Sequence, residues 1–201
     1  KIDKNKDKIK IGFISEFLTN HTIGRIFNGF IKNLNKKKFE ILIFHTPQTK
    51  NGVLKNEIDN TADKVSTLSD EITNQHKKIE EEKLDILFYT DIGMSPTTYF
   101  LAFARLAPIQ IVSWGHTETT GIDTIDYFLS SKFFESNIEQ NNYSERLICL
   151  NQIPTFYEPI KNIKLNKNRS ELGLPENVNL YGCPQSLFKF HPDFDLVMAN
   201  I

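Results

Sequence analysis

Short apolar segments alternate with stretches of helical periodicity along most of this chain, and this alternation constrains its fold more than any other feature. We predict strands at residues 8–17, 39–45, 64–68, 84–89, 109–114, 125–129 and 146–150. Helices are predicted between them at 22–34, 53–60, 69–83 and 96–106. Strands that alternate with helices of about a dozen residues are typical of a parallel sheet with helices on both faces. Residues 1–150 are therefore predicted to form one α/β lobe.

The chain after residue 150 has a different pattern. Residues 151–170 contain proline and asparagine without apolar periodicity, which is typical of a linker. A short helix at 168–174, a strand at 178–183 and a helix from Pro192 are predicted to begin a second α/β lobe at 171–201. The chain starts at Lys1 without a methionine and stops at Ile201 inside a predicted helix, so we expect it to be a piece of a longer protein.

Composition restricts the classes of function. The formal net charge of −1 gives the chain no global attraction to nucleic acid or membranes. The sequence has no apolar run of membrane-spanning length and no signal-peptide core, so a cytoplasmic location is expected. Its two cysteines, Cys149 and Cys183, are isolated, which favours neither a zinc site nor a disulfide framework. We expect no metal and no resident cofactor, because no metal-ligand cluster, Walker loop or GxGxxG motif is found.

One loop has the composition of a ligand-binding segment. The strand at 109–114 stops at Gly115, and the loop GHTETTG (115–121) leads to the next apolar segment. Ligands of parallel α/β sheets bind outside the carboxyl ends of the strands. We expect this loop to share that edge with His21, which follows the first strand, and with Asp91, a minor candidate after the strand at 84–89. The residues alone also allow an ordinary polar turn at 115–121.

Four segments resemble family 41 glycosyltransferases, the group of the protein O-GlcNAc transferases, and occur in the same order. They are IGFISEFLTNHTIGR (11–25), APIQIVSWGHTETTGIDTIDYFLSS (107–131), YSERLICLNQIPTFYEP (143–159) and LYGCPQSLFKFHPDFDLVMANI (180–201). The resemblance implies a GT-B-like arrangement with a Rossmann-like first lobe, a truncated second lobe that binds nucleotide, and the active site between them. It also implies tetratricopeptide repeats upstream of the chain.

The resemblance implies a role for several positions. Lys189 and His21 are the expected catalytic residues: a lysine at the first position contacts the diphosphate, and a histidine at the second faces the cleft. A lysine can stabilise the charge that grows on a leaving diphosphate. The expected donor- and acceptor-binding residues are Gly115, His116, Thr119, Thr120 and Gln185.

Each of these roles has a simpler alternative. His21 can instead satisfy backbone groups at the start of its helix, where Asn20 or Thr22 can equally be the N-cap. Lys189 can be an ordinary exposed lysine. Glu118, the only carboxylate of the loop, is not assigned as the general base, because the family has no constant carboxylate there.

The leading functional prediction is a metal-independent, inverting transferase that moves a sugar to Ser or Thr hydroxyls of protein. UDP-N-acetylglucosamine is the expected donor, as a co-substrate, and a protein or peptide is the expected acceptor. Related protein N-glucosyl- or O-fucosyltransferases remain an alternative, and so does a non-catalytic module that binds peptide or sugar. Since the family places most donor contacts after Ile201, the 201-residue chain alone is expected to be inactive.

Overall fold

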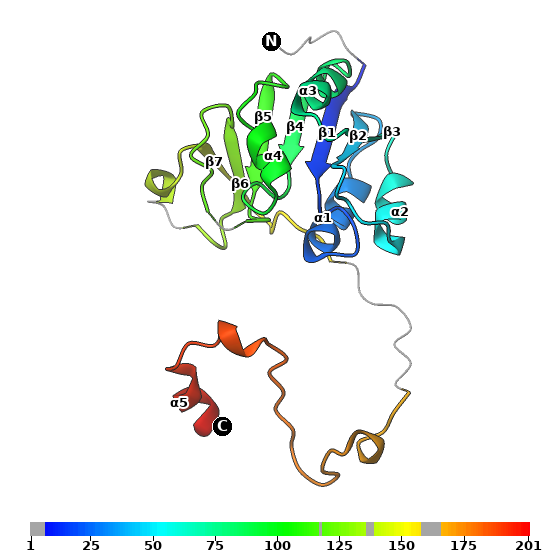
Figure 1. The fold of residues 1–201 in the computed structure, drawn as a ribbon. Helices are drawn as coiled ribbons and strands as arrows, with labels where there is room; N and C mark the ends of the chain where they lie inside the picture. The colour runs from blue at the N-terminus through cyan, green and yellow to red at the C-terminus, as the bar shows by residue number, and fades with distance from the viewer. Residues whose placement is uncertain (1–6, 117, 136–138, 158–165) are drawn as a thin grey trace. The chain divides into compact units, whose positions relative to one another are not determined.

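The computed structural model describes residues 7–116, 118–135, 139–157 and 166–201. The chain divides into two compact units, Lys1–Pro159 and Ile160–Ile201. The first unit contains every strand that is formed in the described residues (Figure 1).

The first unit is built on a seven-stranded sheet in the order β3-β2-β1-β4-β5-β6-β7. All neighbouring strands run parallel, as predicted. The strands are β1 (Ile9–Ser15), β2 (Phe39–His45), β3 (Lys64–Thr67), β4 (Ile86–Tyr89), β5 (Ile109–Ser113), β6 (Tyr127–Ser131) and β7 (Arg146–Leu150). The sheet reverses its order between β1 and β4, because the chain moves outward from β1 to β3 and then returns to β4 and continues to β7.

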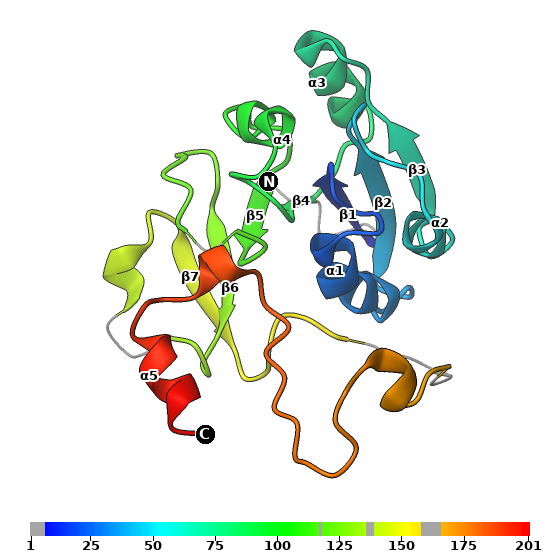
Figure 2. The same cartoon turned by 60° about the horizontal axis from the view of Figure 1, so that its bottom comes forward.

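Helices pack on both faces of this sheet, which confirms the predicted layers (Figure 2). They are α1 (Thr22–Lys32), α2 (Val53–Asp59), α3 (Ile72–Glu80) and α4 (Pro96–Leu101). One buried cluster joins α1 and α2 to one face, and it contains Phe27, Ile58 and Phe13. A second cluster joins α3 and α4 to the other face, through residues such as Ile79 and Leu101.

The central strands are apolar on both sides because both faces are covered. In β1, the neighbouring residues Phe13 and Ile14 belong to the two different clusters and are fully buried. Successive side chains of a strand point to opposite faces, so a strand between two helical layers needs a continuous apolar run. The segment IKIGFIS meets this requirement.

Several helices are shorter than predicted. The helix expected at 96–106 ends at Leu101, and the helix expected at 69–83 spans Ile72–Glu80, with Glu71 as its N-cap. The described residues between β5 and β6 form no helix, so this part of the chain is an irregular segment. In the described ranges, no helix has the length and apolar character needed to cross a membrane.

The second unit contains little regular structure. It has two short 3-10 helices, η2 (Ser170–Leu172) and η3 (Leu187–Lys189), and the helix α5 (Phe194–Ala199). The predicted strand at 178–183 is not formed, and its residues are exposed. A strand needs a neighbour for its backbone N–H and C=O groups, and within the described part of this unit no second strand is present.

Candidate functional site

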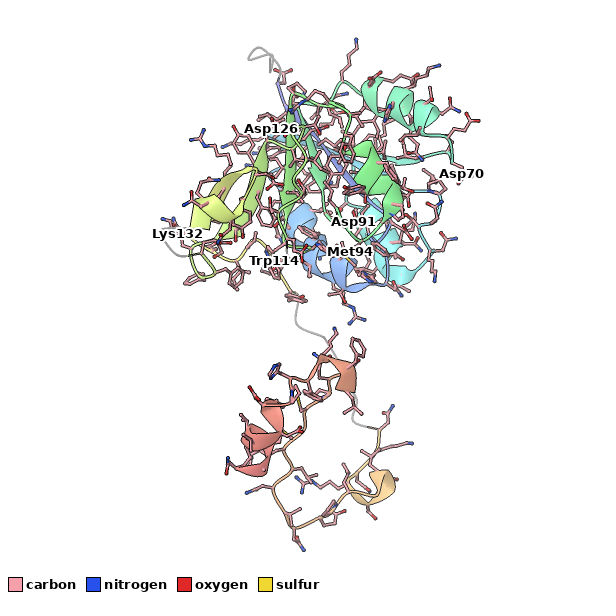
Figure 3. The ribbon with its side chains drawn as sticks, turned by 60° about the vertical axis from the view of Figure 1, so that its left-hand side comes forward. Asp70, Asp91, Met94, Trp114, Asp126 and Lys132 are labelled. Carbon is pink, nitrogen blue, oxygen red and sulfur yellow. The ribbon has the colours of Figure 1, made fainter. Side chains whose placement is uncertain are left out.

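The sheet has a switch point at its carboxyl edge, between β1 and β4, where the order of the strands reverses. β1 and β4 are neighbours there, while the connections that follow them lead to opposite faces of the sheet. Such a switch point leaves a crevice that is the usual ligand site of an open α/β sheet. Figure 3 shows Asp91, Met94 and Trp114 at this end of the first unit, with Asp126 at the opposite end of the sheet.

His21 lies at this edge as the N-cap of α1. Its Nδ1 accepts a hydrogen bond from the backbone N–H of Ile23 at 3.2 Å, and its ring lies 4.6 Å from that of Phe17. His21 itself is therefore the N-cap of α1, which was the simpler alternative to a catalytic role. Because Nδ1 accepts this hydrogen bond, the neutral imidazole carries its proton on Nε2, which can donate to a ligand.

Gly24 explains how closely the turn before α1 packs on the helix. A Cβ atom at this position would lie 2.1 Å from the carbonyl oxygen of Thr19. That oxygen also accepts a hydrogen bond from the backbone N–H of His21 at 2.6 Å. The glycine in NHTIGR therefore allows the turn to place His21 against the helix.

Gly115 and His116 meet the same edge after β5. A Cβ atom at Gly115 would lie 1.8 Å from the carbonyl oxygen of Thr90 and 3.1 Å from Cδ1 of Ile23, so this residue passes close to the loop after β4 and to the start of α1. The ring of His116 lies about 3.2 Å from the position of a Cβ on Gly93, which has a φ of +97°. The prediction that His21, Gly115 and His116 share one sheet edge is confirmed.

Thr119 and Thr120 do not lie at that edge, so this part of the prediction is wrong. Both hydroxyls donate to the carboxylate of Glu145, Thr119 to Oε2 at 2.7 Å and Thr120 to Oε1. Glu145 directly precedes β7, so these residues lie at the amino end of that strand. In a parallel sheet, the connection from β5 to β6 has to return from the carboxyl to the amino end, and only its first residues remain at the candidate site.

Buried residues fix the path of this return. Ile122 and Ile125 belong to the same buried cluster as Leu101 of α4, and Thr124 donates its hydroxyl hydrogen bond to the carbonyl of Ala102. The segment therefore covers the face of the sheet beside α4. Thr119 and Thr120 stabilise the connection through Glu145, and their expected contact with a ligand has no support from this geometry.

Glu145 is held by these contacts as an ionised group. Burial alone would raise the pKa of Glu145, but hydrogen bonds from Thr120 and Thr119 outweigh that effect and lower the pKa below its usual value. The backbone N–H of Thr120 also donates to Oε1 at 2.8 Å.

Asp91 has more importance in the structure than in the sequence prediction. Its side chain is fully buried at the end of β4, and its Oδ2 accepts hydrogen bonds from Oγ of Ser15 at 3.1 Å and from the backbone N–H of Glu16 at 3.2 Å. Burial raises the pKa of Asp91 to about 7, against the opposing effect of these hydrogen bonds. The carboxyl group therefore changes its protonation state close to neutral pH.

Two residues that make these contacts were missed in the sequence. Ser15 is the last residue of β1 and contacts Asp91, and a polar residue at the end of an apolar strand was a usable signal for it. Glu145 had no comparable signal, because its partners are 25 and 26 positions earlier in the chain.

Lys189 and Gln185 belong to the second unit. Lys189 is the last residue of η3, is exposed, and has its Nζ 6.0 Å from the centre of the Phe188 ring. The side-chain oxygen of Gln185 accepts a hydrogen bond from the backbone N–H of Ser186 at 3.0 Å. The expected contact of Lys189 with a nucleotide diphosphate and that of Gln185 with the donor or acceptor stay predictions. Across the residues that the structure describes, no group of three or more His, Cys, Asp or Glu side chains is arranged to hold a metal ion.

The doubly wound parallel sheet with helices on both faces gives the first unit a GT-B-like α/β architecture. The sequence model of Glycosyl transferase family 41 matches residues 1–157, and the chain belongs to this family.

Individual relatives agree with this assignment. A probable UDP-N-acetylglucosamine–peptide N-acetylglucosaminyltransferase of Arabidopsis thaliana is 24% identical over 203 residues, which cover 96% of this chain and 21% of the relative. A UDP-glucose:protein N-beta-glucosyltransferase of Actinobacillus pleuropneumoniae serotype 5b is 33% identical over 115 residues, which cover 54% of this chain and 17% of the relative.

A solved structure has the same fold. It is a mutant O-GlcNAc transferase of Thermobaculum terrenum, with a TM-score of 0.67 and 19% sequence identity over 74% of this chain and 28% of that chain. The chain therefore spans between 17% and 28% of the length of these three proteins.

Proposed function

We propose that the protein containing this chain transfers a sugar from a UDP-sugar donor to a protein side chain. The observation that carries this proposal is the meeting of His21, Gly115 and His116 at the switch point of a family 41 lobe. We further propose N-acetylglucosamine as the sugar and Ser or Thr hydroxyls as the acceptors, with inversion at the anomeric carbon and without a metal ion.

In this reaction the acceptor oxygen attacks the anomeric carbon as the bond to the diphosphate breaks, and negative charge grows on the departing UDP. Lys189 is proposed to stabilise that charge as a compact cation. His21 is proposed to position the reactants, with its Nε2 donating a hydrogen bond in the crevice while Nδ1 stays bound to the backbone. The group that removes the acceptor proton is not assigned.

A second candidate is transfer of glucose to asparagine. The N-beta-glucosyltransferase of Actinobacillus pleuropneumoniae is more similar to the matched part of this chain, at 33% identity, than the Arabidopsis relative is over its longer match, at 24%. An O-fucosyl transfer, or a scaffold that binds without turnover, completes the alternatives.

The decisive experiment uses the full-length protein, because we expect the 201-residue chain alone to lack activity. The protein is incubated with UDP-N-acetylglucosamine or UDP-glucose and with peptides that offer Ser and Thr or only Asn, and the products are read by intact mass. N-acetylglucosamine on Ser or Thr supports the proposal, and glucose on Asn supports the second candidate. Absence of both transfers in the folded protein contradicts both and leaves O-fucosyl transfer, which GDP-fucose tests with the same peptides, and the scaffold.

His21 needs a variant that separates catalysis from capping. His21→Asn keeps an N-cap acceptor for the backbone N–H of Ile23 and removes the imidazole. We expect its stability to match the wild type while transfer falls. A variant of wild-type activity would show that His21 acts only as a helix cap.

A further inference from the structure

Asp91 connects the two loops that leave the switch point in opposite directions. It follows β4, whereas its hydrogen-bond donors lie 76 and 75 positions earlier. They are Oγ of Ser15, the last residue of β1, and the backbone N–H of Glu16, which follows that strand. The side chain of Asp91 has no exposed surface, and its Oδ1 has no hydrogen-bond partner in the described residues. A buried carboxyl in this position fixes one loop to the other.

The contacts of Ser15 extend this connection to His21. Oγ of Ser15 accepts a hydrogen bond from the backbone N–H of Phe17 at 2.7 Å, in addition to the one that it donates to Asp91. The Phe17 ring packs against the His21 ring, with 4.6 Å between the centres. The carbonyl of Phe17 also accepts from the N–H of Thr19 at 2.7 Å, and the carbonyl of Thr19 accepts from the N–H of His21.

We propose that Asp91 is a positioning residue, which holds the His21 imidazole at the sheet edge through Ser15 and Phe17. Its meaning for catalysis rests on the proposed function, while the positioning itself does not. A serine hydroxyl between a buried carboxyl and the backbone of the turn leaves Phe17 little freedom. The Phe17 ring then limits the orientations of His21.

The chemistry of the carboxyl suggests the variants. Burial raises the pKa of Asp91 to about 7, and the negative charge of Glu16 adds to this effect. Asp91→Asn resembles the uncharged form and keeps an oxygen that can accept from Ser15 and Glu16. Asp91→Leu removes that acceptor and keeps the branching at Cγ, with larger methyl groups in place of the two oxygens. Ser15→Ala removes the connecting hydroxyl and leaves Asp91 in place.

Ser130→Ala is the matched control. Ser130 is also a buried serine near the end of a strand, and its hydroxyl also donates to a carboxylate, Oε1 of Glu135 at 2.6 Å. It belongs to β6, which is separated from β1 by two strands of the sheet. The control therefore loses the same kind of hydrogen bond without touching the turn of His21.

The positioning is tested in the 201-residue chain by proton–carbon NMR of the His21 ring. The nearby Phe17 ring shifts these resonances by its ring current. We expect this shift to persist in Asp91→Asn and Ser130→Ala and to be lost in Ser15→Ala and Asp91→Leu. A wild-type shift in folded Ser15→Ala overturns the proposal, and this variant decides the matter if Asp91→Leu does not fold.

Transfer activity of the full-length protein provides the second measurement. Misplacement of a catalytic side chain by about 1 Å costs roughly a hundredfold in rate, so we expect kcat per folded molecule to fall by about ten- to a hundredfold in Ser15→Ala and to stay unchanged in Ser130→Ala. Unchanged kcat in Ser15→Ala overturns the catalytic meaning of the positioning. If the wild type transfers no sugar, the proposed function fails while the NMR result still decides the positioning.

Discussion

At the scale of single residues, Asp91 carries an ionisable carboxyl where water does not reach it. Its pKa is about 7 in the folded chain and 3.8 in an exposed reference state. Between these values the folded state binds more protons than the unfolded state, so the free energy of unfolding decreases as the pH rises. The difference between 3.8 and about 7 corresponds to roughly 4 kcal/mol that is lost between these pH values.

We therefore expect Asp91→Asn to flatten the pH dependence of stability. The free energy of unfolding of the variant, relative to that of the wild type, should be higher at about pH 8 than at about pH 5, because the introduced amide cannot ionise. Urea unfolding at both pH values measures this gain, with Asp70→Asn as a control at an exposed aspartate. An equal pH dependence in the wild type and in Asp91→Asn would show that the buried carboxyl is not the source.

Lys189 allows a test of transition-state stabilisation in the full-length protein. We expect Lys189→Ala to lower kcat roughly a hundredfold, by analogy with the loss of one donor to a developing oxyanion, with a smaller effect on peptide binding. Lys189→Arg should recover activity only partly, because the planar guanidinium differs in shape from the ammonium group. Steady-state kinetics with a UDP-sugar and an acceptor peptide measure both, and a wild-type kcat in Lys189→Ala would remove this residue from the mechanism.

At the scale of elements, apolar periodicity predicted the order of strands and helices in the first unit. The strands at 39–45 and 146–150 have the predicted bounds, because both are apolar runs between polar residues. The predicted strand at 178–183 has a similar local pattern but no neighbour among the described residues of its unit. Local sequence indicates the tendency to form a strand, and the presence of a partner decides whether the strand forms.

The candidate site shows the same limit. The edge at which His21, Gly115 and His116 lie was predictable, because each belongs to the connection that follows an apolar strand. The position of Thr119 and Thr120 was not predictable from the sequence. It depends on which residues of the connection from β5 to β6 lie at the carboxyl end of the sheet and which lie at the amino end. Ser15 can bond to Asp91 because β1 and β4 are neighbours in the sheet. The sequence pattern predicts the strands but not their order in the sheet.

Glu145 is expected to hold the connection between β5 and β6 in its folded conformation. Glu145→Gln removes the charge that three hydrogen bonds from Thr119 and Thr120 stabilise, so the amide of Thr120 should exchange faster with deuterium at about pH 7. The pKa of Glu145 is lowered in the folded state, so its contribution to stability is present above its ordinary pKa and is lost as the pH falls through the folded value.

The difference in exchange between Glu145→Gln and the wild type should therefore shrink in acid, after correction for the intrinsic exchange rates. Glu118→Gln is the control, because Glu118 belongs to the same loop and is exposed. Equal protection of Thr120 in Glu145→Gln and the wild type at about pH 7 would show that the buried apolar residues alone hold this segment.

At the scale of the molecule, the chain combines a seven-stranded sheet with a second unit whose described residues have little regular structure. Family membership rests on residues 1–157, and so it rests on the first unit. The second unit contains Lys189, the expected diphosphate contact, and Gln185, an expected donor- or acceptor-binding residue. The two catalytic residues of the proposal therefore come from different units.

The sheet order also has a consequence for synthesis of the chain. β1 lies between β2 and β4, so one of its edges remains unpaired while β2, β3 and α3 are made. An unpaired strand edge can pair with other chains, and pairing of distant segments is slow to form. Nascent chains stopped before β4 should therefore be cleaved readily by protease, whereas chains that extend beyond β5 should resist. If the shorter and the longer nascent chains resisted protease equally, β1, β2 and β3 would be stable without β4.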